Sequence, residues 1–401
     1  MGTAAKAGAV VAGLAVAGAA VYGGVALIGG DGGTSAQRLA PPSANPPALP
    51  GRKDRTEARP FTLVATGDII PYPSIIQRAA DDAGPRGGHD FRKILAGVKP
   101  VVEAADVAIC HHEIPYGRPG GPYTGYPTFK APHQLADALQ VTGYDSCSTA
   151  SNHTLDAGYD GLTRTLEHLD RVGIKHVGSA RSAAEAKAPA LLEAGGAKIA
   201  QLSYTYGTNG IPLPQDKPWA VNLLDRDRVI ADARAARAAG ADVVVLSIHW
   251  GTEWQTAPDA QQRELAQALT AARTGGLPDI DLIIGTHNHV PQPYEKINGT
   301  WVVFGMGDQV ASFTPADKKR GNQSSIPRFT LNPSAEHPGR WEVVKAEFFT
   351  QYSDMGPPFR VVCTSCASTA PRSDYTAVDR QVTEAVLSRG AGGQGLQRAT
   401  R

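Results

Sequence analysis

The stretch Asp242–Gly251 reads DVVVLSIHWG, and the stretch Asp281–His289 reads DLIIGTHNH. In each, a short apolar run rich in Val, Ile and Leu is followed by a polar cluster that contains histidine. The length of the runs and their β-branched residues favour buried strands, although periodicity alone does not separate such runs from buried helix. The polar chemistry therefore follows directly on the expected strands.

The same order of apolar run and polar cluster recurs along the chain. It is found in Phe61–Thr66 before Gly67–Asp68, Asp106–Cys110 before His111–Glu113, Tyr144–Ser148 before Ser151–His153, and Trp301–Phe304 before Gly305–Asp308. Helical stretches are expected at Leu162–Arg171, Arg226–Ala239 and Asp259–Arg273. Strands that alternate with helices predict an α/β fold with a largely parallel sheet covered on both faces, and ligands bind beyond the carboxyl ends of such strands. The alternating segment Trp341–Gln351 is expected to add antiparallel strands.

The overall charge excludes one large class of partners. The 401 residues carry 39 basic and 38 acidic side chains, a net charge of +1. Nucleic-acid-binding proteins usually carry a strongly basic surface, so no nucleic-acid partner is expected.

The first residues predict export from the cytoplasm. The run 7–30 has no charged side chain, and its length favours an uncleaved membrane anchor over a cleaved signal peptide, which stays the alternative. A Pro/Gly-rich disordered linker is expected at 31–60, one folded domain at 61–385 and a disordered tail at 386–401. The protein is thus expected to be extracytoplasmic, either anchored to the cell membrane or secreted.

Four cysteines agree with an oxidising compartment. Cys110 and Cys147 each end an expected strand, and Cys363 and Cys366 form a CTSC segment. We expect two structural disulfides. A redox pair or half of a zinc site are the alternatives for the second pair.

Five of the polar clusters together predict a metal site. Their residues are Asp68, Glu113, Asn152 with His153, His249, and His287 with His289. Carboxylate oxygen and imidazole nitrogen suit Zn, Mn or Fe, and one or two divalent ions are expected. Asn152 can ligate a metal through its amide oxygen, which leaves His153 free as an acid or base. Asp156 either orients the His153 ring or caps the following helix, and the cap is the favoured interpretation.

The ordered motifs resemble a known family. GDIIP at Gly67–Pro71, HHEIPY at His111–Tyr116, SNHTLDAGYDGL at Ser151–Leu162, HWGTEW at His249–Trp254 and GTHNHVPQPYE at Gly285–Glu295 are similar to motifs of the bacterial CapA capsule-synthesis family, which is associated with poly-γ-glutamate. That family is similar to calcineurin-like metallophosphoesterases. The resemblance implies a four-layer sandwich, with two central mixed β-sheets flanked by helices, around a dinuclear metal site.

The resemblance also implies roles for the site residues. Glu113 would bridge the metals; Asn152, His249 and His287 would complete one position, Asp68 and His289 the other, with His153 as general acid.

The chain departs from the usual metallophosphoesterase pattern at one motif. The usual Asp-x-His motif is absent, because Asp68 is followed by Ile69 and Ile70. His111 and His112 are expected to pack at the surface or behind the ligands, with compensation for the absent imidazole as the alternative.

Two Gly/Pro/aromatic loops, 117–130 and 203–219, are expected to rim the site. Arg118, Lys130, Tyr204 and Tyr206 are the candidates for contact with an anionic polymer, and simple packing of the loops is the alternative.

Three functions fit this sequence. The first is a metal-dependent hydrolase of the cell envelope, acting on a phosphoester or on an anionic, amide-linked cell-envelope polymer. The second is a non-catalytic component of a membrane complex for poly-γ-glutamate synthesis or export. The third is a secreted nucleotidase, which the absent Asp-x-His motif disfavours.

Overall fold

The structure is a computed structural model that describes residues 58–400. The predicted anchor (1–30) and most of the predicted linker (31–60) lie outside this range. Within it, no helix is both long enough and apolar enough to cross a membrane.

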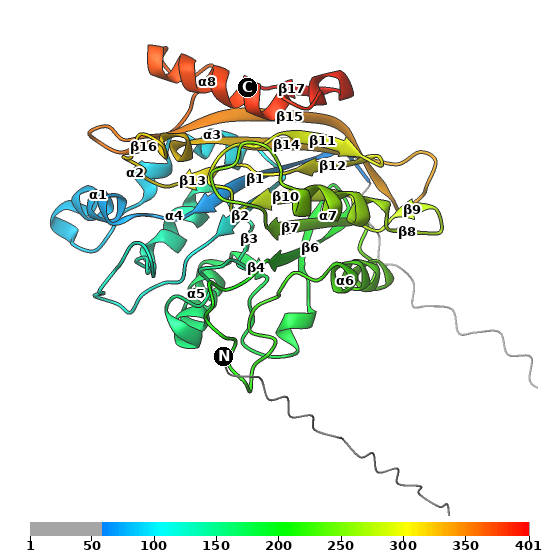
Figure 1. Cartoon of the computed structure of the whole chain (residues 1–401), viewed down its shortest axis with the longest axis horizontal. Helices are drawn as coiled ribbons and strands as arrows, with labels where there is room; N and C mark the ends of the chain where they lie inside the picture. Colours follow the sequence, from blue (N-terminus) through cyan, green and yellow to red (C-terminus); the bar gives the residue numbers. More distant parts are fainter. Residues whose placement is uncertain (1–57, 401) are drawn as a thin grey trace, which may run out of the picture. The chain divides into compact units, whose positions relative to one another are not determined.

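Two mixed β-sheets form the centre of the described residues (Figure 1). The order of the first sheet is β16 (Arg360–Cys363), β15 (Trp341–Asp354), β14 (Gln323–Pro333), β1 (Phe61–Ile69), β2 (Val107–His112), β3 (Ser146–Ser148) and β4 (Lys175–Val177), with β13 (Asp308–Val310) beside β1 and β17 (Leu396–Arg398) beside β15. The order of the second is β11 (Tyr294–Ile297), β12 (Thr300–Val303), β10 (Leu282–Thr286), β7 (Val243–His249), β6 (Ala197–Thr205) and β5 (Ala190–Ala194). A short hairpin pairs β8 (Arg273–Thr274) with β9 (Leu277–Pro278).

Alternation along the strands explains why the sheets stack. In β1, Leu63 lies in the core between the sheets while Val64 lies in the core under the helices. In β7, Val245 faces the first sheet and Val244 faces the other way. Because successive side chains of a strand point to opposite faces, each sheet has two apolar faces, one for the partner sheet and one for helices.

Helices cover the outer faces. They are α1 (Pro73–Ala83), α2 (Arg92–Leu95), α3 (Lys99–Glu103), α4 (Gln134–Thr142), α5 (Gly158–Val172), α6 (Arg226–Ala238), α7 (Ala260–Ala271) and α8 (Ser373–Leu387). The first five pack on the first sheet, and α6 and α7 pack on the second. Figure 1 shows α8 along β15, which it contacts. The three expected helices are confirmed as α5, α6 and α7, and α7 begins with a capping box made by Asp259 and Gln262.

The predicted four-layer sandwich with two mixed sheets is confirmed, whereas the prediction of one largely parallel sheet is wrong. Parallel pairing holds for β1 to β4 and for β6, β7, β10 and β12. The expected antiparallel segment is confirmed as β15, which pairs with β14 and β16.

The predicted disordered tail (386–401) is wrong for the residues described. Leu396–Arg398 form β17, which pairs in parallel with β15, and the Ala399 amide donates to the Phe348 carbonyl at 2.8 Å. Leu396 is buried in the core that includes both sheets and α8. This one buried apolar residue lies in a polar segment, so the composition alone wrongly predicts disorder.

Both expected disulfides are present. Cys110 on β2 is bonded to Cys147 on β3, and the two residues are register partners in these parallel strands. Cys363 is bonded to Cys366.

Candidate metal centre

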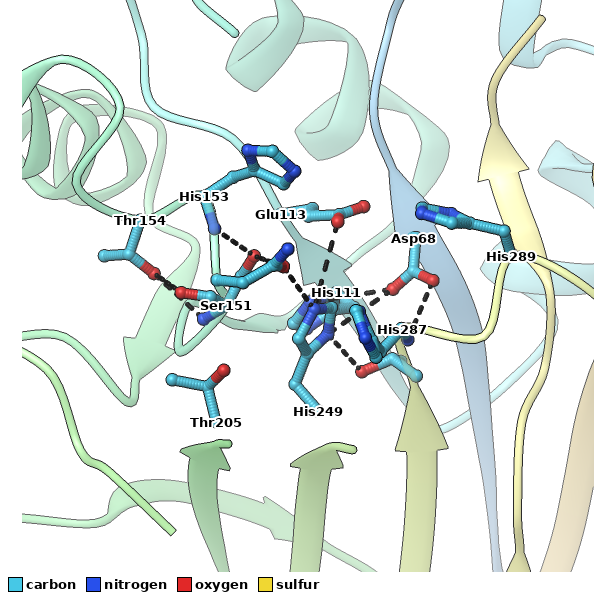
Figure 2. A network of polar contacts seen from close by, with 12 residues as sticks. Asp68, His111, Glu113, Ser151, His153, Thr154, Thr205, His249, His287 and His289 are labelled. Carbon is cyan, nitrogen blue, oxygen red and sulfur yellow. Dashed lines mark hydrogen bonds and ion pairs between the residues drawn. The ribbon is translucent and has the colours of Figure 1, made fainter. Parts of the chain in front are cut away.

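The carboxyl ends of strands from both sheets bring the predicted site residues together (Figure 2). Asp68 in β1 is the register partner of His111 in β2 and of Asp308 in β13. In the second sheet, His249 at the end of β7 is the partner of Thr286 at the end of β10. Parallel strands end at one edge of each sheet, so residues far apart in sequence become neighbours there.

Gly67 permits the close approach of β13 that places Asp308 beside Asp68. A Cβ atom at Gly67 would lie 1.7 Å from the Gly307 carbonyl oxygen, far inside van der Waals contact. Any other residue would therefore push Asp308 away from the site.

The turn after β10 aims two imidazoles at the same place. His287 has φ of 92° and His289 has φ of 59°, a left-handed backbone that is unfavourable for residues other than glycine. The backbone N–H of His287 donates to Asp68 Oδ2 at 3.0 Å. His289 Nδ1 lies 2.9 Å from Asp308 Oδ1, a carboxylate–imidazole contact that fixes the ring.

His249 is surrounded by ligand-type atoms. Its Nδ1 is 3.9 Å from Asp68 Oδ1, and its Nε2 is 3.9 Å from Glu113 Oε1 and 2.8 Å from Asn152 Oδ1. Figure 2 shows the Asp68 and Glu113 side chains converging on His249. The His287 ring lies beside it, with ring centroids 4.7 Å apart.

Several buried polar atoms in this cluster have no hydrogen-bond partner. They are Asp68 Oδ1, both carboxylate oxygens of Glu113, His111 Nε2, His287 Nδ1 and Asp308 Oδ2. A buried polar group without a partner costs about 1–3 kcal/mol, and more when it is charged. Atoms of the types that bind divalent cations therefore converge in one place with their lone pairs unused, which fits a metal site.

Two sets of side chains in the described residues are close enough to hold a cation. Asp68, His111 and His249 form one, and Asp68, Glu113 and His289 form the other, with the ligand atoms of each within 4.8 Å of one another. Asp68 belongs to both sets, so the geometry favours Asp68 as the shared carboxylate where the resemblance implied Glu113. His287 belongs to neither set.

The charges in the cluster repel one another unless a cation enters. Burial raises the pKa of Glu113 well above its ordinary value, and the charge of Asp68 raises it further. Burial lowers the pKa of His249 well below its ordinary value, and the nearby His111 adds to the effect. Burial also lowers the pKa of His289, but Asp308 and then Glu113 outweigh it, and the net pKa is about 10. A divalent cation would replace the protons that these groups otherwise retain.

Asp156 orients the His153 ring, so the favoured cap interpretation is wrong. His153 Nδ1 lies 2.7 Å from Asp156 Oδ2, and that same oxygen accepts the Phe129 backbone N–H at 2.7 Å. No side chain caps α5, whose N-cap residue is Ala157. His153 is also held through its backbone N–H, which donates to Ser151 Oγ at 3.0 Å. The pair has the arrangement of an oriented acid–base imidazole.

The loop candidates separate into two groups. Tyr206 lies beside the site, with its ring 4.6 Å from that of His287. Tyr204 does not: it is buried under α6 and its hydroxyl donates to Asp232, so its expected contact with substrate is wrong. Arg118 is exposed, and Lys130 follows Phe129, whose ring contacts His153. Their predicted contact with a polymer stays a prediction.

Sequence reasoning missed Asp308, and it placed His111 among packing residues. Asp308 follows a strand just as the other clusters do, so its position was visible. A lone carboxylate in the segment Gly305–Asp308 carries no further signal in the sequence, because its contact with His289 forms only when the chain folds. His112 does pack away from the cluster, against Tyr116.

Comparison with known proteins gives the chain relatives over part of its length. It is 31% identical over 175 residues to the PGA biosynthesis protein CapA of Bacillus subtilis, which is 43% of this chain and 44% of that protein. It is 30% identical over 177 residues to a "Probable polyglutamine synthesis accessory protein" of Mycobacterium tuberculosis, 42% of this chain and 45% of that protein. The matches thus span less than half the length of these curated relatives.

Among solved structures, the chain is similar to a 5'-nucleotidase precursor of Thermus thermophilus, with a TM-score of 0.43 and 15% identity over 84% of this chain and 59% of that one. At that level the likeness says nothing about activity. The family model described as "Bacterial capsule synthesis protein PGA_cap" matches residues 62–312, which is more than half of the chain and includes every strand-end residue of the metal cluster. The chain therefore belongs to the bacterial capsule synthesis protein family PGA_cap.

Proposed function

We propose that this chain is a metal-dependent hydrolase of the cell envelope, and that a phosphoester is the bond it cleaves. The observation that carries the proposal is the convergence of unpartnered buried carboxylate and imidazole atoms next to an oriented His153–Asp156 pair. Metal ligands alone would suit a structural site. An acid–base imidazole at their edge is what a hydrolase adds.

The residues of the site have separate roles in phosphoester cleavage. Bound divalent cations would supply charge stabilisation at the phosphoryl oxygens and a water of lowered pKa. Asp68 and Glu113 hold negative charge at the centre, His289 is fixed by Asp308, and His249 is fixed at Asn152. His153, held by Asp156, delivers a proton to the leaving oxygen.

The proposed location is outside the cytoplasm, with the N-terminal segment as an anchor. The uncharged run 7–30 and the two disulfides support it, because disulfides persist in oxidising compartments. An anionic envelope polymer as substrate and a membrane synthase or export complex as partner follow from the family's association with capsule synthesis.

A non-catalytic component of a membrane complex for poly-γ-glutamate synthesis or export, in which the metal is structural, is the second candidate. Deep burial of the cluster favours it, because Asp68 is 0% exposed, Glu113 1% and His249 1%, and a closed site suits a structural metal better than one that must admit a substrate. Only turnover separates the two candidates.

The test is hydrolysis by the full chain after treatment with a chelator and reloading with Mn²⁺ or Zn²⁺. The substrates are a phosphodiester, a phosphomonoester and poly-γ-glutamate. We expect phosphoester hydrolysis that requires the added metal and falls about 10²–10⁴-fold in His153→Ala, as loss of a general acid does. The exposed His337→Ala serves as the control. If the metal-loaded protein hydrolyses none of the three, the hydrolase proposal is contradicted and the non-catalytic component of a synthesis or export complex remains.

A further inference from the structure

The adjacent residues His111 and His112 point to opposite faces of β2. The His111 ring stacks on that of His249, with centroids 4.7 Å apart and planes 22° apart. The His112 ring meets Tyr116 edge-on, 4.7 Å away, in the core under the helices. Both residues are 2% exposed. Two equally buried imidazoles therefore differ only in what they face.

His111 directs a free nitrogen at the shared carboxylate. Its Nε2 lies 3.6 Å from Asp68 Oδ1, and neither atom has a hydrogen-bond partner. That separation is too long for a hydrogen bond. It matches two ligands of one cation, since ligands at about 2.0–2.1 Å from a tetrahedral ion lie roughly 3.4 Å apart.

Ser148 sets which nitrogen of His111 carries the proton. The Ser148 hydroxyl donates to the Cys110 carbonyl at 3.3 Å, so its oxygen accepts from His111 Nδ1, which is 2.8 Å away. The proton is then on Nδ1 and the lone pair on Nε2 faces Asp68.

We propose that His111 is a metal ligand, with Nε2 as the ligating atom in a set with Asp68 and His249, and that Ser148 is its positioning residue. The inference rests on the metal centre of the proposed function. His111 would supply the imidazole that the GDIIP motif lacks, since the position of the usual histidine is taken by Ile70, which is buried in the core. A set with two imidazoles favours Zn²⁺, Co²⁺ or Fe²⁺ over Mg²⁺, which prefers oxygen.

The test is titration of the full chain with Co²⁺ alone, read by visible absorption and by competition with a chelator. We expect His111→Phe to change the Co²⁺ spectrum and to weaken one binding event more than 100-fold, beyond the roughly 10–100-fold that loss of a supporting residue costs. Ser148→Ala is expected to fall within that 10–100-fold range. His112→Phe is the matched control, and it is expected to keep the native spectrum and affinity within about threefold.

Each outcome decides the proposal. Native affinity and spectrum in His111→Phe would overturn it while leaving the hydrolase proposal standing, and so would an equal loss in His112→Phe. No Co²⁺ binding by the native chain would overturn both. If His111→Phe does not fold, Ser148→Ala decides, because unchanged Co²⁺ affinity there would contradict the positioning of His111.

Discussion

The substitution Asp156→Asn tests the role of the carboxylate that contacts the His153 ring. The Asp156 side chain is 1% exposed, and one of its oxygens accepts both from His153 and from the Phe129 backbone. Asn keeps the shape and an acceptor for Phe129 but removes the charge that stabilises a protonated imidazole. A hydrogen bond to a charged group contributes about 1.5–3 kcal/mol. At 1.36 kcal/mol per factor of ten, kcat should fall about 10- to 150-fold.

The assay is steady-state phosphoester hydrolysis by the metal-loaded full chain, with denaturant unfolding in parallel. KM should change little, because Asp156 does not contact the metal ligands, and the free energy of unfolding should fall by no more than about 3 kcal/mol, the contribution of the lost charged hydrogen bond. Asp160→Asn, an exposed aspartate in the first turn of α5, is the matched control. The positioning role is refuted if Asp156→Asn has the same kcat as Asp160→Asn, or if its loss of activity follows a loss of folded protein.

Three other predictions concern the cluster and its supports. Metal binding near pH 7 should release at least one proton, because the pKa of His289 is raised to about 10. The apparent metal affinity should then rise by about tenfold per pH unit for each proton released. Calorimetry in buffers of different ionisation enthalpy measures the release, and finding none would contradict the prediction. Gly67→Ala should destabilise the fold by about 3 kcal/mol or more and weaken metal binding, because the alanine Cβ would overlap the Gly307 carbonyl oxygen. Gly207→Ala is the control: a Cβ there has open space, so stability and metal binding should not change. Replacing Cys110 and Cys147 together by Ala should lower the free energy of unfolding by about 3–4 kcal/mol, as expected for a loop closed over a separation of 37 residues, and an unchanged denaturation midpoint would refute the estimate.

The strand ends were predictable because two local signals coincide there. A short apolar run predicts a buried strand, and the polar residues that follow it must lie at a sheet edge, as His249 after Val243–Ile248 shows. No long-range information is needed for this step. The grouping of residues around the metals could not be obtained in that way, because it depends on the register between strands: Asp68 pairs with His111 and with Asp308, which are far away in sequence.

The wrong predictions share a physical cause, which is competition between local and tertiary contacts. Asp156 has the local position of a helix cap, but folding places it under His153. Tyr204 has the composition of a rim residue, yet strand alternation turns it to the helix side with Leu202. Leu396 lies in a Gly-rich segment, and its burial against β15 orders the residues around it.

The most direct test of the central claim is the metal content of the full chain, purified without chelators and measured by elemental analysis alongside the double variant Asp68→Asn, His249→Ala. The cluster described here predicts one to two equivalents of a transition metal in the native protein and almost none in the variant, because Asp68 belongs to both ligand sets. A native protein that holds no stoichiometric metal, even after loading with Zn²⁺ or Mn²⁺, would contradict the claim that these buried side chains form a metal centre.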